Sequence, residues 1–361
     1  MSEHFETRLA LQLRAAAQRE ERRGALARRL SRVRLSLPAA PIVAAATVAV
    51  ALLAVVAVVG GLRWGGEEPV TAPRVVADVA IADNLGTLHA GSGAVWAADT
   101  AKGQILRLDP RTRAVQARIP AGGEARVTAG AGAVWVVNER GRLLRIDPAT
   151  NRVTARVALR LPNGDPLSLL DVQILGGAPW VIGVEGALRI DARDGHVAGF
   201  TPVEQGAAEP LLEPLFMVGS GDSLWVLTRE QRLERYALAT GRRTEDVAVR
   251  LPGAIAVLPT PAGPVYITRE GEIARADGSD GRIAWRRTLG TSVSGPLLRG
   301  STLWVHASDA AGRDRVVELD LDSGKVRSSA PLPQFGVSGA AFVGRQLWIT
   351  TPGGRLMVLQ R

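Results

Sequence analysis

The 361-residue sequence contains no cysteine. Disulfide bonds, cysteine-ligated structural zinc, thiol catalysis and lipid attachment to an N-terminal cysteine are therefore excluded. Aromatic residues make up only 4% of the chain, whereas glycine occurs 40 times. Few large side chains and many turn-forming residues are typical of a fold with many tight turns.

Lysine is almost absent as well. Of the 44 basic residues only Lys102 and Lys325 are lysines, and the net charge is +9. Residues 1–36 hold nine Arg and four Glu, so that +5 of this charge lies there and +4 in the rest of the chain. Beyond residue 36 the basic residues alternate with Asp and Glu, as on a solvated surface and unlike a phosphate-binding stripe. Nucleic acid is therefore not an expected partner.

A long apolar run lies between Leu35 and Leu62, where no residue is charged. About 20 apolar residues cross the ~30 Å hydrocarbon core of a bilayer. The preceding 36 residues and the length of the run favour an uncleaved anchor over a cleaved signal peptide. We therefore predict a transmembrane helix at residues 37–62.

The two flanks of this run differ in charge, which predicts its orientation. Arginines crowd the N-terminal flank, whereas Glu67 and Glu68 follow the run. By the positive-inside rule, residues 1–36 stay in the cytoplasm and the C-terminal part is exported across the cell membrane. The spacing of Phe5, Leu9 and Leu13 predicts that the cytoplasmic tail is helical. Residues 63–73, rich in Gly, Glu and Pro, form a linker.

A repeated unit fills the rest of the chain. The clearest copies span residues 93–119 and 132–157, and each contains a GAVW segment, an L-R-[LI]-D-P segment and an alternating apolar–polar segment. Spacings of 38 to 45 residues separate the marker aromatics of seven copies, which are Trp96, Trp135, Trp180, Trp225, Tyr266, Trp304 and Trp348. Such a period of short strands is typical of propeller blades. We predict an all-β, seven-bladed β-propeller of four-stranded blades at residues 74–361.

The seventh copy ends at Arg361 after its third strand. Residues Arg74 to Ile81 precede the first copy and have the pattern of the outer strands. We predict that they pair beside Leu356–Leu359, which completes the last blade and removes an exposed strand edge.

Recurring aspartates stand at equivalent turn positions in separate copies, so they cannot converge on one metal ion. Hydrogen bonds from each Asp to its own turn explain them. They are Asp109, Asp147, Asp191, Asp277 and Asp320.

These motifs resemble the YVTN, quinoprotein-like and virginiamycin-B-lyase-like propeller superfamily over residues 75–361. The resemblance implies the fold. It leaves the function open, because the superfamily includes lyases, dehydrogenases, adhesins and scaffolds.

The resemblance to enzymes of that superfamily implies catalytic residues, and their presence can be checked in this sequence. The lyases imply Mg²⁺ with closely placed His and Glu, but His89, His196 and His306 lie in three different copies and none in a His-x-Glu cluster. Residues 276–285 loosely resemble a quinoprotein Asp…Gly…Trp signature, and the adjacent-cysteine pair of many such enzymes is impossible here. No Ser–His–Asp order stands out either. We expect no catalytic residue, cofactor or metal.

With no catalytic site expected, we predict that the propeller binds a partner through loops at one of its rims. The turns between second and third strands and the connections between blades should emerge at the same rim, and the longest connections are predicted at Leu161–Asp171 and Thr201–Phe216. Loops longer than closure needs often carry function, although solvated insertions look alike. The candidate residues are Arg140, Asp165, Asp171, Glu209, Leu211, Leu212, Glu213, Leu215, Arg229 and Arg269.

The sequence thus predicts a membrane-anchored extracytoplasmic module with a non-catalytic binding, sensing or scaffold role. Mixed charges at the rim fit a protein or peptide partner. The alternative is an exported propeller enzyme of the lyase or quinoprotein type.

Overall fold

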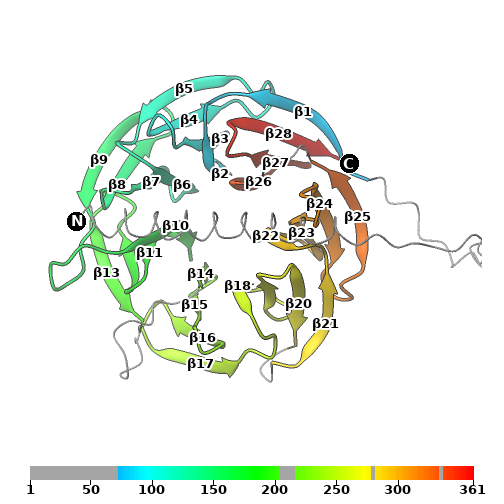
Figure 1. Cartoon of the computed structure of the whole chain (residues 1–361). Coiled ribbons are helices and arrows are strands. Elements are labelled where there is room, and N and C mark those ends of the chain that lie inside the picture. The colour runs from blue at the N-terminus through cyan, green and yellow to red at the C-terminus, as the bar shows by residue number, and fades with distance from the viewer. Residues whose placement is uncertain (1–71, 204–215, 278–280, 333–335) are drawn as a thin grey trace, which may run out of the picture. The chain divides into compact units, whose positions relative to one another are not determined.

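The computed structural model describes residues 72–203, 216–277, 281–332 and 336–361. Within these ranges 28 β-strands form seven antiparallel sheets of four strands each. The sheets stand around a ring as blades, with the first strand of each blade innermost and the fourth outermost (Figure 1). The predicted seven-bladed propeller is confirmed.

The blades follow one another along the chain. Blade 1 comprises β2 (Leu85–Gly91), β3 (Ala94–Asp99), β4 (Gln104–Leu108) and β5 (Val115–Pro120). Blade 2 comprises β6 (Ala125–Gly130), β7 (Ala133–Asn138), β8 (Arg142–Asp147) and β9 (Arg152–Ala158). Blade 3 comprises β10 (Leu169–Leu175), β11 (Ala178–Gly183), β12 (Gly186–Ile190) and β13 (Val197–Pro202). Blade 4 comprises β14 (Phe216–Ser220), β15 (Ser223–Leu227), β16 (Arg232–Ala237) and β17 (Arg243–Ala248).

The last three blades repeat this order. Blade 5 comprises β18 (Ala254–Leu258), β19 (Val265–Thr268), β20 (Glu272–Ala276) and β21 (Ile283–Thr288). Blade 6 comprises β22 (Ser292–Arg299), β23 (Thr302–Ser308), β24 (Asp314–Asp320) and β25 (Val326–Pro331). Blade 7 comprises β26 (Gly339–Val343), β27 (Gln346–Thr350), β28 (Arg355–Gln360) and, as its outer strand, β1 (Arg74–Ala80).

Burial along the strands follows the sequence pattern. Every residue of β7 is buried, as the apolar AVWVV segment predicts for a strand between two neighbouring blades. The outer strand β9 alternates exposed and half-buried residues, because only one of its faces meets the protein.

The core consists of the wedges between blades, and the marker aromatics fill them. Trp96, Trp135 and Trp348 are fully buried. Each large ring removes an extensive apolar area from water in the space between two sheets. Trp225 departs from the pattern, since it is only half-buried.

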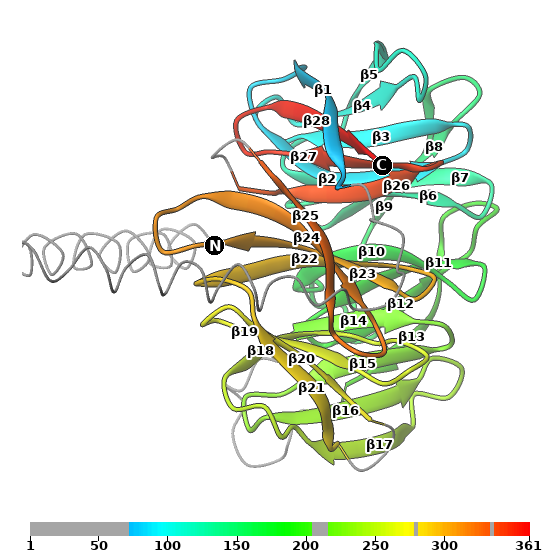
Figure 2. The same ribbon diagram turned by 90° about the vertical axis from the view of Figure 1, so that its right-hand side faces the viewer.

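The two ends of the propeller meet in blade 7. β1 pairs with β28 in antiparallel register from Arg74 opposite Gln360 to Ala80 opposite Arg355, with a bulge between Val75 and Ala77. The two strands lie side by side in both views (Figures 1 and 2). The predicted closure is therefore confirmed.

The predicted cytoplasmic tail, transmembrane helix and most of the linker lie outside the described residues. In the part of the chain that the structure describes, no helix is long and apolar enough to cross a membrane.

We predict that closure by β1 stabilises the whole propeller. Removal of residues 65–82 should lower its melting temperature by roughly 5–10 °C, because a loss of a few kcal/mol shifts Tm by about 2–4 °C per kcal/mol in large domains. Removal of residues 65–73 alone should leave Tm nearly unchanged, since β1 is kept. Equal melting of the two shortened chains in a circular dichroism scan would contradict the closing role of β1.

Candidate binding site at the upper rim

Backbone hydrogen bonds join the turn between the second and third strands of a blade to the connection that enters or leaves it. The Glu139 amide donates to Glu124 O at 2.9 Å, and the Leu159 amide donates to Gly141 O at 2.8 Å. We call this face, formed by the second-to-third-strand turns and the connections between blades, the upper rim. Because these contacts recur around the ring, both kinds of loop emerge at one rim, as predicted.

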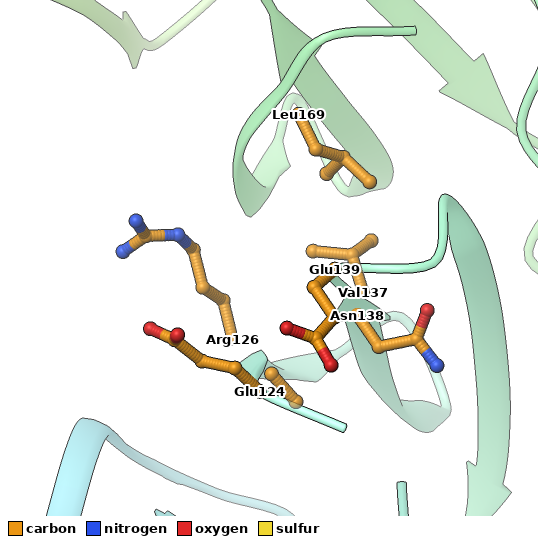
Figure 3. A pocket seen from close by; sticks show the side chains of 7 residues that line it. Glu124, Arg126, Val137, Asn138, Glu139 and Leu169 are labelled. Carbon is orange, nitrogen blue, oxygen red and sulfur yellow. The ribbon is translucent and has the colours of Figure 1, made fainter. Parts of the chain in front are cut away.

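A pocket of about 140 Å³ opens in the upper rim near the start of β6. Glu124, Arg126 and Glu139 contribute charged side chains to it, and Leu169 lies across from them (Figure 3). The three charged residues are exposed. A small, polar, open depression of this kind can take a side chain of a partner but is too small to enclose a drug-sized ligand.

Asn138 fixes the turn beside this pocket. Its side chain is buried, its Nδ2 donates to Ala121 O at 2.7 Å, and its Oδ1 accepts from the Arg140 and Arg142 amides at 3.1 Å. Asn138 therefore stabilises the turn, and the turn fixes the backbone of the exposed residues Glu139 and Arg140.

The predicted arginines of the rim all lie in equivalent turns. Arg140 follows β7, Arg229 follows β15 and Arg269 follows β19, and each is exposed. They stand in three different blades, so they ring the upper rim without forming one cluster. A partner that contacts all three would have to cover several blades.

The connection predicted at Leu161–Asp171 is shorter than expected, because β10 already begins at Leu169. Asp165 lies exposed at the tip, where its Oδ2 accepts from Asn163 Nδ2 at 2.8 Å. The prediction that Asp171 belongs to this loop is wrong, since it is part of the innermost strand. Leu167 is buried against blade 3, so the apolar residues of the loop serve packing.

The second long connection, predicted at Thr201–Phe216, has strand at both ends. Thr201 belongs to β13 and Phe216 to β14, so the prediction is wrong for these two residues. The remaining predicted site residues lie outside the described part of the chain and stay predictions; they are Glu209, Leu211, Leu212, Glu213 and Leu215.

Asp171 of β10 and His89 of β2 lie on the innermost strands of their blades, close enough for the charge of Asp171 to act on His89. His89 is half-buried, and its Nδ1 accepts a hydrogen bond from the Ala129 amide of the next blade at 3.2 Å. Burial lowers the pKa of His89, and the negative charge of Asp171 partly opposes this effect. Gln173 bridges blades in the same way, since its Oε1 accepts from the Gly219 amide at 3.0 Å. These polar groups satisfy amides at the inner edges of neighbouring sheets.

The structure does assemble a Ser–His–Asp set that the sequence order did not reveal. Ser294 Oγ lies 3.0 Å from His306 Nδ1, and His306 Nε2 lies 3.1 Å from Asp314 Oδ1. Burial raises the pKa of Asp314, but hydrogen bonds from Ser308 and Gly336 outweigh it and hold that pKa below its usual value. The cavity that His306 lines measures only about 10 Å³. That space holds about one water molecule, so a substrate has no room there. The three residues instead join three neighbouring strands of blade 6.

Four of the five recurring aspartates accept hydrogen bonds within their own turns, as predicted: Asp109, Asp147, Asp191 and Asp320. For Asp277, the turn that follows lies outside the described residues. Asp109 Oδ1 accepts from the Arg111 and Thr112 amides at 2.8 Å, which lowers the pKa of Asp109. Asp320 accepts from the Ser323 hydroxyl and amide in the same manner, and its pKa falls to about 2. The described residues contain no group of three or more His, Asp or Glu that could hold a metal ion.

The segment that loosely resembles a quinoprotein signature joins two blades. Trp285 of β21 donates through Nε1 to Leu321 O of blade 6 at 2.8 Å. A Cβ added at Gly324 would collide with the Trp285 ring, so the absence of a side chain there lets the two blades approach. The segment therefore has a structural contact that accounts for its Trp.

We predict a pH dependence of stability from His89. Its pKa in the folded protein lies below the ordinary value of 6.5, so the folded state binds fewer protons than the unfolded state. The contribution of neutral His89 to the free energy of unfolding is fully present above pH 6.5 and is lost as the pH falls below that value. Thermal melts should show a steeper fall of Tm between pH 6.5 and 5 for the native chain than for His89→Asn, whose amide oxygen can replace Nδ1 as acceptor. Parallel curves would contradict this role.

A comparison with protein families matches residues 189–361 to the family described as outer membrane protein assembly factor BamB. A comparison with curated proteins finds no match. Among solved structures, BamB from Moraxella catarrhalis is similar with a TM-score of 0.55 at 13% identity, covering 80% of this chain and 100% of that one.

Virginiamycin B lyase from Staphylococcus aureus is also similar in fold. A catalytically inactive variant solved with quinupristin has a TM-score of 0.61 at 14% identity, and the selenomethionine-substituted enzyme has 0.60 at 15%. Each comparison covers 80% of this chain and 99% of the lyase. Identities this low show a common fold and do not transfer an activity.

Proposed function

We propose that this chain, whose propeller is of the quinoprotein-like, YVTN-type superfamily, is a membrane-anchored extracytoplasmic module that binds a protein or peptide without catalysis. The observation that carries the proposal is the upper rim, where exposed charges of both signs stand on turns fixed by buried hydrogen bonds. Turns that are already rigid reduce the part of the entropy cost of binding that comes from ordering loops.

The charge pattern supports a polar protein surface as the partner. Glu124, Glu139, Arg126 and Arg140 present both signs within a short distance along the chain. Complementary charges of both signs give specificity and orient a partner, whereas a polyanion would need one sign. The family name "assembly factor" points in the same direction for the related proteins.

The proposed anchor rests on the apolar run at residues 37–62 and on the arginines before it. A linker of residues 63–73 would separate the membrane from the propeller, which would leave the rim accessible on the outer side. The cytoplasmic tail, residues 1–36, would then set the orientation of the chain.

Because the chain lacks cysteine, its topology can be tested with single Ser→Cys changes. Ser329 is exposed on the outer strand β25, so Ser329→Cys should react with a membrane-impermeant maleimide on intact cells. Ser31→Cys should react only after the cells are opened. Labelling of Ser31→Cys alone on intact cells would invert the proposed orientation.

Photo-crosslinking can test the upper rim. A photoreactive residue at position 140 or 269 should crosslink one defined partner in intact cells, whereas position 111, exposed in a turn at the opposite face, should not. In a second experiment the photoreactive residue stands at another position of the upper rim. The combined changes Arg140→Glu, Arg229→Glu and Arg269→Glu should then lower the crosslinking yield about tenfold or more, as expected when interfacial charges are reversed. Equal crosslinking from both faces would contradict the rim proposal. A stoichiometric metal or quinone in the purified protein would favour the enzyme alternative.

A further inference from the structure

Four consecutive blades carry a Trp and an Arg at the same cross-strand positions. The marker Trp of the second strand stands opposite an Arg of the third strand in the sheet register. We call this pair with its acceptors in the next blade the latch. The pairs are Trp96–Arg107, Trp135–Arg145, Trp180–Arg189 and Trp225–Arg235.

In blades 1 and 2 the latch is closed. The Arg107 guanidinium lies 5.6 Å from the centre of the Trp96 ring and donates to Pro148 O at 2.7 Å and Asn151 Oδ1 at 2.9 Å. Both acceptors belong to the turn between the third and fourth strands of the next blade. Arg145 lies 5.8 Å from the centre of its Trp ring and donates to Ala192 O at 3.1 Å. Each closed latch therefore ties two blades together.

In blade 3 the latch is open. Arg189 is exposed and makes no hydrogen bond, ion pair or ring contact with any other described residue. The acceptor positions in the turn of blade 4 differ from those in blade 2. Leu238 O, which corresponds to Pro148 O, accepts instead from Thr201 Oγ1 at 3.0 Å, and Gly241 stands where Asn151 supplied its side-chain oxygen.

The partner ring has a free donor as well. The indole nitrogens of Trp96 and Trp135 donate to Gly91 O and Gly130 O at 3.1 and 3.0 Å. Trp180 is 6% exposed, and its Nε1 has no acceptor among the described residues. Trp180 Nε1 itself is not fully buried, so it can donate to water or to a ligand that enters the pocket beside it.

Both free donors line a pocket between blades 3 and 4. The pocket measures about 460 Å³, within the usual range for small-molecule sites. Leu175, Phe200 and Leu238 contribute apolar walls. The pocket lies on the face of the first-to-second-strand and third-to-fourth-strand turns, which we call the lower rim, and so it is separate from the upper rim.

We propose that this lower-rim pocket binds a monocarboxylate with an apolar body. The closed latches show what Arg189 lacks, namely two oxygen acceptors, and a carboxylate offers both to a guanidinium in a bidentate arrangement. The apolar body would lie against Leu175, Phe200 and Trp180. Asp222 stands at the edge of the pocket, where its negative charge disfavours a ligand with a second anionic group.

The test uses the full-length protein and 3-phenylpropionate as the probe. The ¹H–¹⁵N signal of the Trp180 indole, assigned with Trp180→Phe, should shift on titration with the acid and stay in place with 3-phenylpropionamide. Arg189→Ala should weaken binding about tenfold or more, as expected for loss of a charge-assisted hydrogen bond. Because the Arg189 side chain makes no hydrogen bond, ion pair or ring contact with any described residue, the same variant should keep the native Tm.

Arg145→Ala is the matched control. It removes the same side chain from a closed latch, so it should lower Tm and leave the affinity for 3-phenylpropionate unchanged. A phenylalanine-ended pentapeptide with a free or an amidated C-terminus distinguishes the source of the carboxylate. Tighter binding of the free-acid peptide than of 3-phenylpropionate assigns a chain terminus, and the reverse order assigns a small organic acid.

Three results would overturn the proposal. The Trp180 signal could fail to move with either acid, the neutral amides could bind as tightly as the acids, or Arg189→Ala could lower Tm as much as Arg145→Ala does. The last result would make Arg189 a structural latch. None of these outcomes bears on the upper rim, which is tested by crosslinking.

Discussion

The pairing of β1 with β28 is the contact on which the ring depends. Without it, blade 7 would consist of three strands, and the outer edge of β28 would be unpaired. The wedge between blades 7 and 1 is apolar, with Trp348 and Leu356 of one blade packed against Leu85 and Leu106 of the other. Since the outer strand comes from residues that precede blade 1, the same pairing fixes both ends of the propeller at this wedge. Every loop at either rim is positioned by a ring closed in this way.

Within the closed ring the contacts between blades are not uniform. Arg107 and Arg145 close latches across the wedges 1–2 and 2–3, and Trp285 and Arg287 make a different set of hydrogen bonds across the wedge 5–6. At the wedge 3–4 the corresponding Arg189 has no polar partner among the described residues. The upper rim is more regular, because the same backbone hydrogen bonds recur there from blade to blade. A repeated fold therefore combines constant contacts that maintain the ring with local departures from the repeat.

The sequence predicted the ring because its signals are local and repeated. A Trp or Tyr every 38 to 45 residues marks each wedge, an Asp at the turn makes hydrogen bonds to neighbouring amides, and the pattern of residues 74–81 is that of an outer strand. The boundaries of the long connections were harder to predict. The sequence pattern of Leu169 to Asp171 is compatible with a loop or a strand. These residues form a strand because they pair with β11, which the local sequence does not reveal.

The sites were less predictable, since they depend on which partner a side chain finds in the next blade. Asn138 looks like a surface loop residue in the sequence, yet three hydrogen bonds bury it in its turn. Likewise, Ser294, His306 and Asp314 are separated along the chain and meet only because three strands of blade 6 are adjacent. The open latch did leave a signal in the sequence. Where blade 2 has Asp147-Pro148, blade 4 has Ala237-Leu238.

The turn of blade 4 keeps its shape despite this change. The Ala237 amide still donates to Arg242 O at 2.9 Å, and the Gly241 amide donates to Ala237 O at 2.8 Å, as the corresponding backbone groups do around Asp109 and Arg113 in blade 1. The turn of blade 4 therefore forms without an aspartate cap. Thr201 Oγ1 donates to Leu238 O, and the guanidinium of Arg189 makes no hydrogen bond to any described residue, while the backbone of the turn keeps its fold. An arginine without a structural role at this position costs the fold little, because packing in every wedge and the closure by β1 hold the ring.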